Sequence, residues 1–69
     1  MSIKKYSVMI AGHRTSVSLE PEFWEELKKL AAQEHLTTAE LITRIDADRT
    51  DGLSSSLRLY VLRALVSGN

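Results

Sequence analysis

The sequence predicts a small α+β domain, mostly helical, in which an extended N-terminal segment precedes three helices. Three observations support this prediction. Residues alternate between polar and apolar from Arg14 to Leu19, a proline with acidic neighbours follows at position 21, and apolar residues then recur at helical spacing. With 69 residues the chain is long enough for one domain, so we treat residues 1–69 as a single unit.

Composition narrows the class of protein. The absence of cysteine excludes disulfides and thiolate metal sites. No apolar run approaches the roughly 18 residues that a membrane-spanning helix needs, and no secretory signal precedes the domain, so we expect a cytoplasmic protein without a membrane partner. The formal net charge is zero, but residues 1–19 hold only basic charges, whereas residues 20–40 hold six glutamates and two lysines. The N-terminal segment is therefore basic and the first helix acidic.

The extended segment spans residues 3–19. Residues 3–10, IKKYSVMI, are rich in β-branched and aromatic residues, and Ala11-Gly12 is a plausible break. Farther along, alternation places Thr15, Val17 and Leu19 on one face and Arg14, Ser16 and Ser18 on the other.

A strand needs a partner for its backbone, and two pairings fit the pattern. In the first, two chains align residues 13–19 antiparallel across a two-fold axis and form a ribbon whose polar face enters the major groove of DNA. In the second, these residues pair with residues 6–10 of the same chain, and the hairpin covers the core. The sequence leaves open whether residues 5–10 form that extra strand.

Three helices are expected at about residues 21–34, 38–48 and 54–66. Pro21 suits the first helical position, Thr37 or Thr38 is suited to cap the second helix, and Ser54 or Ser55 the third. The third helix is apolar on two sides, which is typical of a helix buried between elements or between subunits. One side is expected to face the core, and the other is a separate apolar stripe. Leu59, Leu62 and Val66 form it.

The segment SVSLEPEFWEELKKLAAQEHLTTAELI resembles the ribbon-helix-helix domain of the Arc and MetJ repressor superfamily over about residues 13–49. The longer string GHRTSVSLEPEFW, with LSSSLRLYVL later in the chain, is similar to a poorly characterised bacterial subgroup of these domains. The N-terminal extended segment and the third helix exceed the minimal family pattern.

The resemblance implies an intertwined homodimer with an intermolecular two-stranded antiparallel ribbon, acting as a repressor-like regulator of transcription. Arg14, Ser16 and Ser18 would contact base edges of double-stranded DNA. The expected dimer core contains Val17, Leu19, Phe23, Trp24, Leu27, Leu41 and Ile45.

Phosphate contacts are also implied. The second helix of the family offers its N-terminal amides to a phosphate, which assigns Thr37 and Thr38 to this role. Basic residues of the extended segment would add to the contact: Lys4, Lys5 and His13. In an alternative register the third helix takes the place of the family's second helix, residues 37–49 are an insertion, and Ser54 and Ser55 contact the phosphate.

No catalytic constellation, metal site or cofactor motif is evident, so we do not expect an enzyme. His13 and His35 lie far apart in the sequence, and the spacing of the acids around Gly52 does not fit a calcium loop. A second functional hypothesis keeps the fold without strong DNA binding. In it the protein is a dimeric interaction module, similar to an antitoxin or adaptor, that binds another protein through the third helix or through Trp24.

Overall fold

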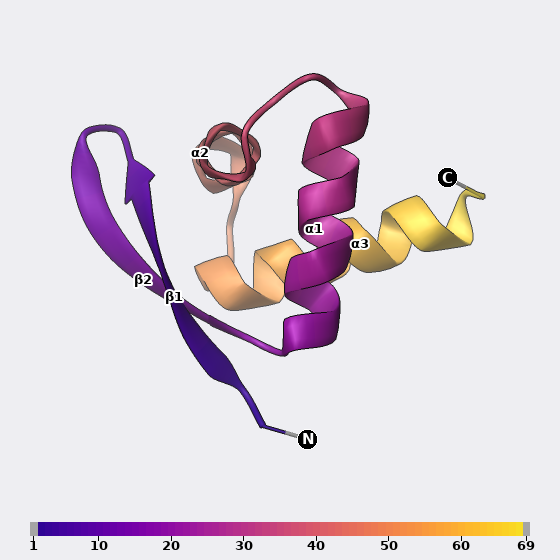
Figure 1. The fold of residues 1–69 in the computed structure, drawn as a ribbon, viewed down its shortest axis with the longest axis horizontal. Helices are drawn as coiled ribbons and strands as arrows, with labels where there is room; N and C mark the ends of the chain where they lie inside the picture. The colour runs from indigo at the N-terminus through magenta and orange to yellow at the C-terminus, as the bar shows by residue number, and fades with distance from the viewer. Residues whose placement is uncertain (1, 69) are drawn as a thin grey trace.

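The computed structural model describes residues 2–68 and places two strands ahead of three helices. Figure 1 shows the strands on one side of the molecule and the helices packed against their inner face. The strands are β1 (Lys4–Ile10) and β2 (His13–Leu19), and the helices are α1 (Pro21–Gln33), α2 (Thr38–Asp48) and α3 (Leu53–Val66). Each helix boundary lies within one residue of the position expected from the sequence.

Strands β1 and β2 form an antiparallel hairpin within the chain. Ala11 and Gly12 form the two-residue turn, and both have positive φ, at 50° and 82°. This pair of values is characteristic of a type I′ turn, whose twist matches that of the flanking strands. The structure therefore shows the hairpin, which was the second of the two pairings that the sequence allowed. Any pairing of β2 with a second copy would have to use its opposite edge.

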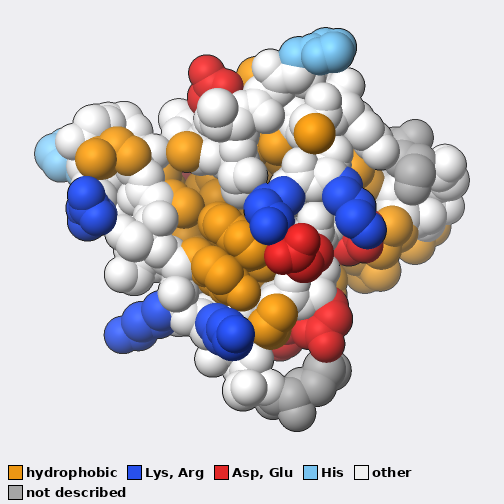
Figure 2. Space-filling view, in the orientation of Figure 1, with side chains coloured by type: hydrophobic (Ala, Val, Ile, Leu, Met, Phe, Trp, Pro, Cys, Tyr) orange, Lys and Arg blue, Asp and Glu red, His pale blue; other side chains and the backbone are white. Residues whose placement is uncertain are grey.

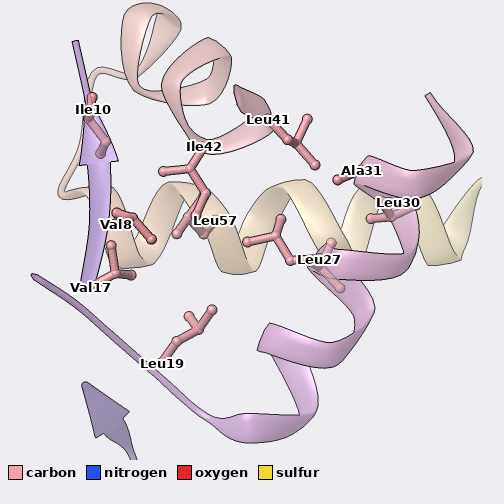
Figure 3. Packing of buried hydrophobic residues seen from close by; sticks show 11 residues of the cluster. Val8, Ile10, Val17, Leu19, Leu27, Leu30, Ala31, Leu41, Ile42 and Leu57 are labelled. Atoms are coloured by element: carbon pink, nitrogen blue, oxygen red, sulfur yellow. The ribbon is translucent and has the colours of Figure 1, made fainter. Parts of the chain in front are cut away.

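The core lies between the hairpin and the three helices. Every element contributes at least one buried apolar side chain, and Figure 3 shows most of these side chains converging. The alternation of β2 has the predicted sense, because Val17 and Leu19 are buried while Arg14 and Ser16 are exposed. The buried set is Val8, Ile10, Val17, Leu19, Leu27, Leu30, Ala31, Leu41, Ile42, Leu57 and Val61.

Helix α1 ends in a Schellman motif without glycine. The amide of Leu36 donates to the carbonyl of Ala31 at 2.9 Å, and the amide of His35 donates to that of Ala32 at 3.1 Å. His35 takes the left-handed conformation, with φ at 60°, that glycine usually takes at this position. Leu36 then packs against the core and turns the chain toward α2.

Helix α3 is tied to the end of β2 by an ion pair. Arg58 Nε donates to Glu20 Oε1 at 2.8 Å, and Glu20 is the N-cap residue of α1, directly after the strand. The guanidinium of Arg58 lowers the pKa of Glu20 through this hydrogen bond, and the backbone N–H of Glu20 adds to the effect. The first half of α3 therefore lies against β2.

Candidate nucleic-acid interface

The outward face of β2 presents the three residues predicted to contact DNA bases. Arg14, Ser16 and Ser18 lie on the side of the strand opposite Val17 and Leu19, which are buried. The hairpin register adds a second row from β1, because residues directly opposite each other in a sheet share a face. The opposing pairs are Met9 with Arg14, Ser7 with Ser16, and Lys5 with Ser18.

Sequence reasoning did not assign Ser7 or Met9 to this surface. Both are exposed, and Arg14 Nη1 donates to Ser7 Oγ at 3.4 Å across the two strands. The signal was available in the alternation of residues 5–10, where Lys5, Ser7 and Met9 occupy every second position and so extend from the same face of the strand. It becomes interpretable only when the pairing partner of β2 is known.

The outward face, defined as Lys5, Ser7, Met9, Arg14, Ser16 and Ser18, lies on a basic part of the chain. Residues 4–19 contain two lysines, one arginine and no acidic residue. Figure 2 shows Lys and Arg side chains without acidic neighbours on the side of the molecule formed by the strands, whereas acidic and basic side chains lie together over the helices in this view. Lys4 and His13 are also exposed, at the two ends of the hairpin. The neutral net charge of the chain thus conceals a local excess of cations.

The N-terminus of α2 has a complete capping box. Thr37 Oγ1 accepts from the amide of Glu40 at 3.1 Å, and the amide of Thr37 donates to Glu40 Oε1 at 2.8 Å. Thr37 is therefore engaged in helix capping, and Thr38 begins the helix behind it. The Glu40 carboxylate lies where an anion would bind, and its charge opposes a phosphate at this end.

The N-terminus of α3 differs from that of α2 in its capping and in the charge of its first turn. Its N-cap is Gly52, which makes no side-chain capping bond, and its first turn holds no acidic residue. The sequence had suggested a serine cap, but Ser54 and Ser55 lie inside the first turn instead. Among the described residues this first turn therefore carries no carboxylate, and the nearest acidic residue, Asp51, lies before the N-cap.

The residues predicted to form the dimer core lie in the core of the single chain. Val17, Leu19, Leu27 and Leu41 are buried there. Three others are partly buried and pack against this cluster: Phe23, Trp24 and Ile45. Trp24 stacks on Tyr6 of β1 with 4.1 Å between ring centroids, so its indole covers the hairpin. The homodimer itself stays a prediction.

A polar cluster joins the C-terminal end of α1 to the middle of α2 and of α3. Glu34 accepts from Arg44 Nη1 at 2.9 Å through one carboxylate oxygen and from the Tyr60 hydroxyl at 3.1 Å through the other. Burial, aided by the Glu34 carboxylate, raises the pKa of Tyr60. Together with the apolar side chains beneath it, the cluster fixes α3 against α2.

Two features bear on other classes of site within residues 2–68. No group of three or more His, Cys, Asp or Glu side chains is arranged to hold a metal ion there. None of the helices in that range is long and apolar enough to cross a membrane.

Comparison with known proteins identifies the family. The family model described as the ribbon-helix-helix domain matches residues 3–65. The match includes both strands and nearly all of the three helices, so β1 and α3 fall inside the family pattern. The corresponding comparisons with curated proteins and with solved structures found no significant match. A strand ribbon followed by helices is the order that the family name describes, and the family model matches nearly the whole chain. The chain therefore belongs to the ribbon-helix-helix domain family.

Proposed function

We propose that the protein is a cytoplasmic, repressor-like transcription regulator that binds double-stranded DNA as a homodimer. Arg14, Ser16 and Ser18 contact base edges in the major groove. The observation that carries the proposal is the outward face of β2, where Arg14 and Ser16 are exposed and Ser18 is half-buried, on a segment without any acidic residue. Ribbon-helix-helix domains are in general dimeric DNA-binding regulators, which supports the assignment.

The chemistry of these side chains suits the major groove. A guanidinium can donate two hydrogen bonds to guanine O6 and N7, and a serine hydroxyl can donate or accept. Arg14 is exposed and, within residues 2–68, makes one long hydrogen bond, to Ser7, so its remaining donors are available to a base. Ser16 and Ser18 keep the face low enough for the strands to approach the base edges.

Phosphate contacts complete the proposed interface. Lys5 lies on the outward face and can neutralise backbone charge beside the groove. Lys4 and His13 are exposed at the two ends of the hairpin, in the row that faces the core, and we propose that they contact phosphates beyond these ends. Of the two helix starts suggested by the family pattern, that of α3 suits a phosphate better, because α2 holds the carboxylate of Glu40 at its N-terminus.

Titration of labelled duplex DNA of mixed sequence tests the proposal. At low salt we expect binding that weakens steeply as salt increases, because each neutralised phosphate releases counterions. Arg14→Ala should lower the affinity by about tenfold, in the range of one bidentate base contact. Lys28→Ala removes the same charge from α1 and serves as the matched control. A wild-type protein without salt-dependent binding to duplex DNA would contradict the proposal.

A second candidate function rests on the outer face of α3. Leu59, Leu62, Leu65 and Val66 are exposed large hydrophobic residues on this helix, and we refer to them as the α3 stripe. Exposed apolar stripes of this kind are typical of protein interaction surfaces, so the chain is also suited to an interaction module. This alternative predicts that the same titration shows no DNA binding, and that Leu62→Asp abolishes association with a protein partner without changing the fold.

A further inference from the structure

We propose that the α3 stripe binds an amphipathic helix of another protein, whose apolar residues are flanked by aspartate or glutamate. This inference rests on the second candidate function, the interaction module, and names the chemistry of its partner. It does not depend on DNA binding, because the α3 stripe and the outward face of the hairpin lie on different elements.

The first argument is the shape of the exposed apolar surface. Three of the four residues of the α3 stripe, Leu59, Leu62 and Val66, recur three and four positions apart and so form one row along the helix. Between positions 59 and 66 the helix rises about 10 Å, or two turns. Leu62 is 52% exposed and Val66 78%, whereas Leu57 and Val61 on the inner side are fully buried. The row therefore matches the apolar side of a second helix laid along it.

The second argument is the charge beside this row. Helix α3 contains Arg58 and Arg63 but no acidic residue, and at 3.6 residues per turn the two arginines lie on opposite sides of the row. The Arg58 guanidinium is paired with Glu20. Arg63 is exposed, and within residues 2–68 it is the one arginine whose guanidinium makes no side-chain hydrogen bond or ion pair. A carboxylate beside the apolar residues of a bound helix would meet this unused cation.

The third argument concerns the acidic residues nearest to this surface. Leu59 and Arg63 also line a groove between α2 and α3, and Asp48 and Asp51 line it as well. Neither aspartate pairs with Arg63 among the ion pairs of the described residues. Asp51 precedes α3, and the helix rises about 15 Å from Leu53 to Arg63. A carboxylate of the partner can therefore approach Arg63 at a distance from Asp51.

The fourth argument disfavours a second copy of the chain as the occupant. Within residues 2–68, large exposed hydrophobic side chains occur on α3 and at Ile3 and Met9, but not on α1 or α2. Residues 2–19 and α3 contain no acidic residue, so no element of this chain combines exposed apolar side chains with carboxylates. Two copies that met through their α3 stripes would bring arginines together. The partner that complements both the row and Arg63 is a different polypeptide.

A library of helical peptides displayed on phage tests the inference, with the full chain as bait. Each peptide has about 18 residues, enough for a helix, with leucines fixed in one apolar row and the flanking positions randomised. We expect selection on the wild type to enrich aspartate and glutamate at the flanking positions. Enrichment of neutral or basic residues at these positions would overturn the inference.

A selected acidic peptide is then titrated against variants and followed by fluorescence anisotropy. Leu62→Ala should weaken binding about tenfold, and Arg63→Ala about threefold, the range of one exposed ion pair. The matched controls are Ile3→Ala, because Ile3 is 55% exposed against 52% for Leu62, and Lys28→Ala, which removes an exposed cation from α1. Both controls should bind like the wild type.

An exchange of charge tests the contact with Arg63 directly. A second peptide carries lysine at each acidic flanking position of the first. Arg63→Glu should bind the lysine peptide more tightly than the wild type does, and the acidic peptide more weakly. Circular dichroism of each variant shows that the fold is kept. If Arg63→Glu ranks the two peptides as the wild type does, Arg63 does not recognise the flanking charge and the inference fails.

The outcomes separate the inference from the function on which it rests. If the selected peptides need Leu62 but carry no acidic flanks, the interaction module stands and the inference fails. If no peptide is enriched, the module and the inference fail together. If Leu62→Asp converts a wild-type dimer into monomers in sedimentation equilibrium, a second copy covers the α3 stripe and the inference is overturned. Acidic flanks, together with the reversed preference of Arg63→Glu, support it.

Discussion

The outward face of the hairpin and the α3 stripe lie outside the same core, yet they differ in chemistry. The hairpin face is built of small polar and cationic side chains with one methionine, whereas the α3 stripe consists of aliphatic side chains only. The composition of each surface depends on how much of its element the core covers. A strand with one buried face can carry any residue on the other, but a helix that is apolar on both sides must leave one side exposed in a single chain.

The difference indicates two kinds of contact for one domain. Polar and cationic groups lose little on leaving water when they meet the phosphates and base edges of DNA. Aliphatic groups are stabilised only by contact with other apolar surface. The hairpin face is therefore suited to nucleic acid and the α3 stripe to protein.

The largest expected effect separates the two sides of α3. Leu57 is fully buried beneath the hairpin, so Leu57→Ala should lower the free energy of unfolding by about 2–5 kcal/mol. Leu62→Ala, on the α3 stripe, should change it by less than about 0.5 kcal/mol. Urea denaturation at constant m-value measures both. A large cost for Leu62→Ala, with a midpoint that depends on protein concentration, would instead show that a second molecule covers the stripe.

The next effect concerns the turn that forms the hairpin. Gly12 has φ at 82°, and a Cβ added there would meet no atom within 4 Å, so Gly12→Ala tests backbone conformation alone. We expect a loss of about 1–2 kcal/mol, the cost of a left-handed alanine. In a domain of this size that is a decrease in Tm of roughly 4–8 °C per kcal/mol.

Ala11→Asn should act in the opposite direction and raise the Tm, because asparagine is favoured at the first position of a type I′ turn. If β2 paired mainly with a second copy, neither substitution would alter stability. Unchanged melting temperatures for both variants would therefore contradict the hairpin.

A smaller effect is expected in the helical half, which has its own left-handed residue. His35→Gly should stabilise the protein by about 0.5–1 kcal/mol, because glycine reaches positive φ without the steric penalty of a Cβ. Thermal unfolding followed by circular dichroism at 222 nm measures the change. A decrease in Tm would show that the imidazole makes a contact that outweighs the backbone strain.

The smallest effect concerns the ion pair that joins the two regions. The pKa of Glu20 lies below its ordinary value near 4.5, so the folded chain holds this carboxylate ionised where the unfolded chain begins to bind a proton. The stabilisation is complete above about pH 4.5 and is lost as the pH falls through the folded pKa. Glu20→Gln should therefore flatten the decrease in stability that occurs as the pH falls below about 4.5.

Denaturant midpoints across this range, with Glu22→Gln as a control in the same first turn of α1, measure the effect. If both variants keep the slope of the wild type, Arg58 does not stabilise the fold through Glu20.

The sequence allowed much of the fold to be predicted, because its strongest signals are local. Alternation identified the buried and exposed faces of residues 14–19, Pro21 marked the start of α1, and Thr37 caps α2 as one of the two threonines expected to do so. Each of these features depends on residues only a few positions apart. Propensity and capping therefore determine them without reference to the rest of the chain.

The pairing of β2 could not be decided in the same way. Val17 and Leu19 face a core whether the partner strand is β1 or a second copy, so the alternation is identical in both arrangements. Ala-Gly is a weaker turn signal than Asn-Gly, because alanine disfavours positive φ, and the hairpin could not be inferred from it. The base-contacting role of the outward face remains a prediction, since side-chain chemistry alone does not identify a ligand.

The two-residue turn also has a kinetic consequence. Because β2 finds its partner strand immediately before it in the chain, the sheet can form by a unimolecular reaction, and isolated hairpins close in about 1–10 μs. A ribbon assembled from two chains would instead form at a rate proportional to protein concentration. The rate at which the hairpin forms therefore does not depend on protein concentration, so the sheet forms equally fast whether a cell holds few or many newly made molecules.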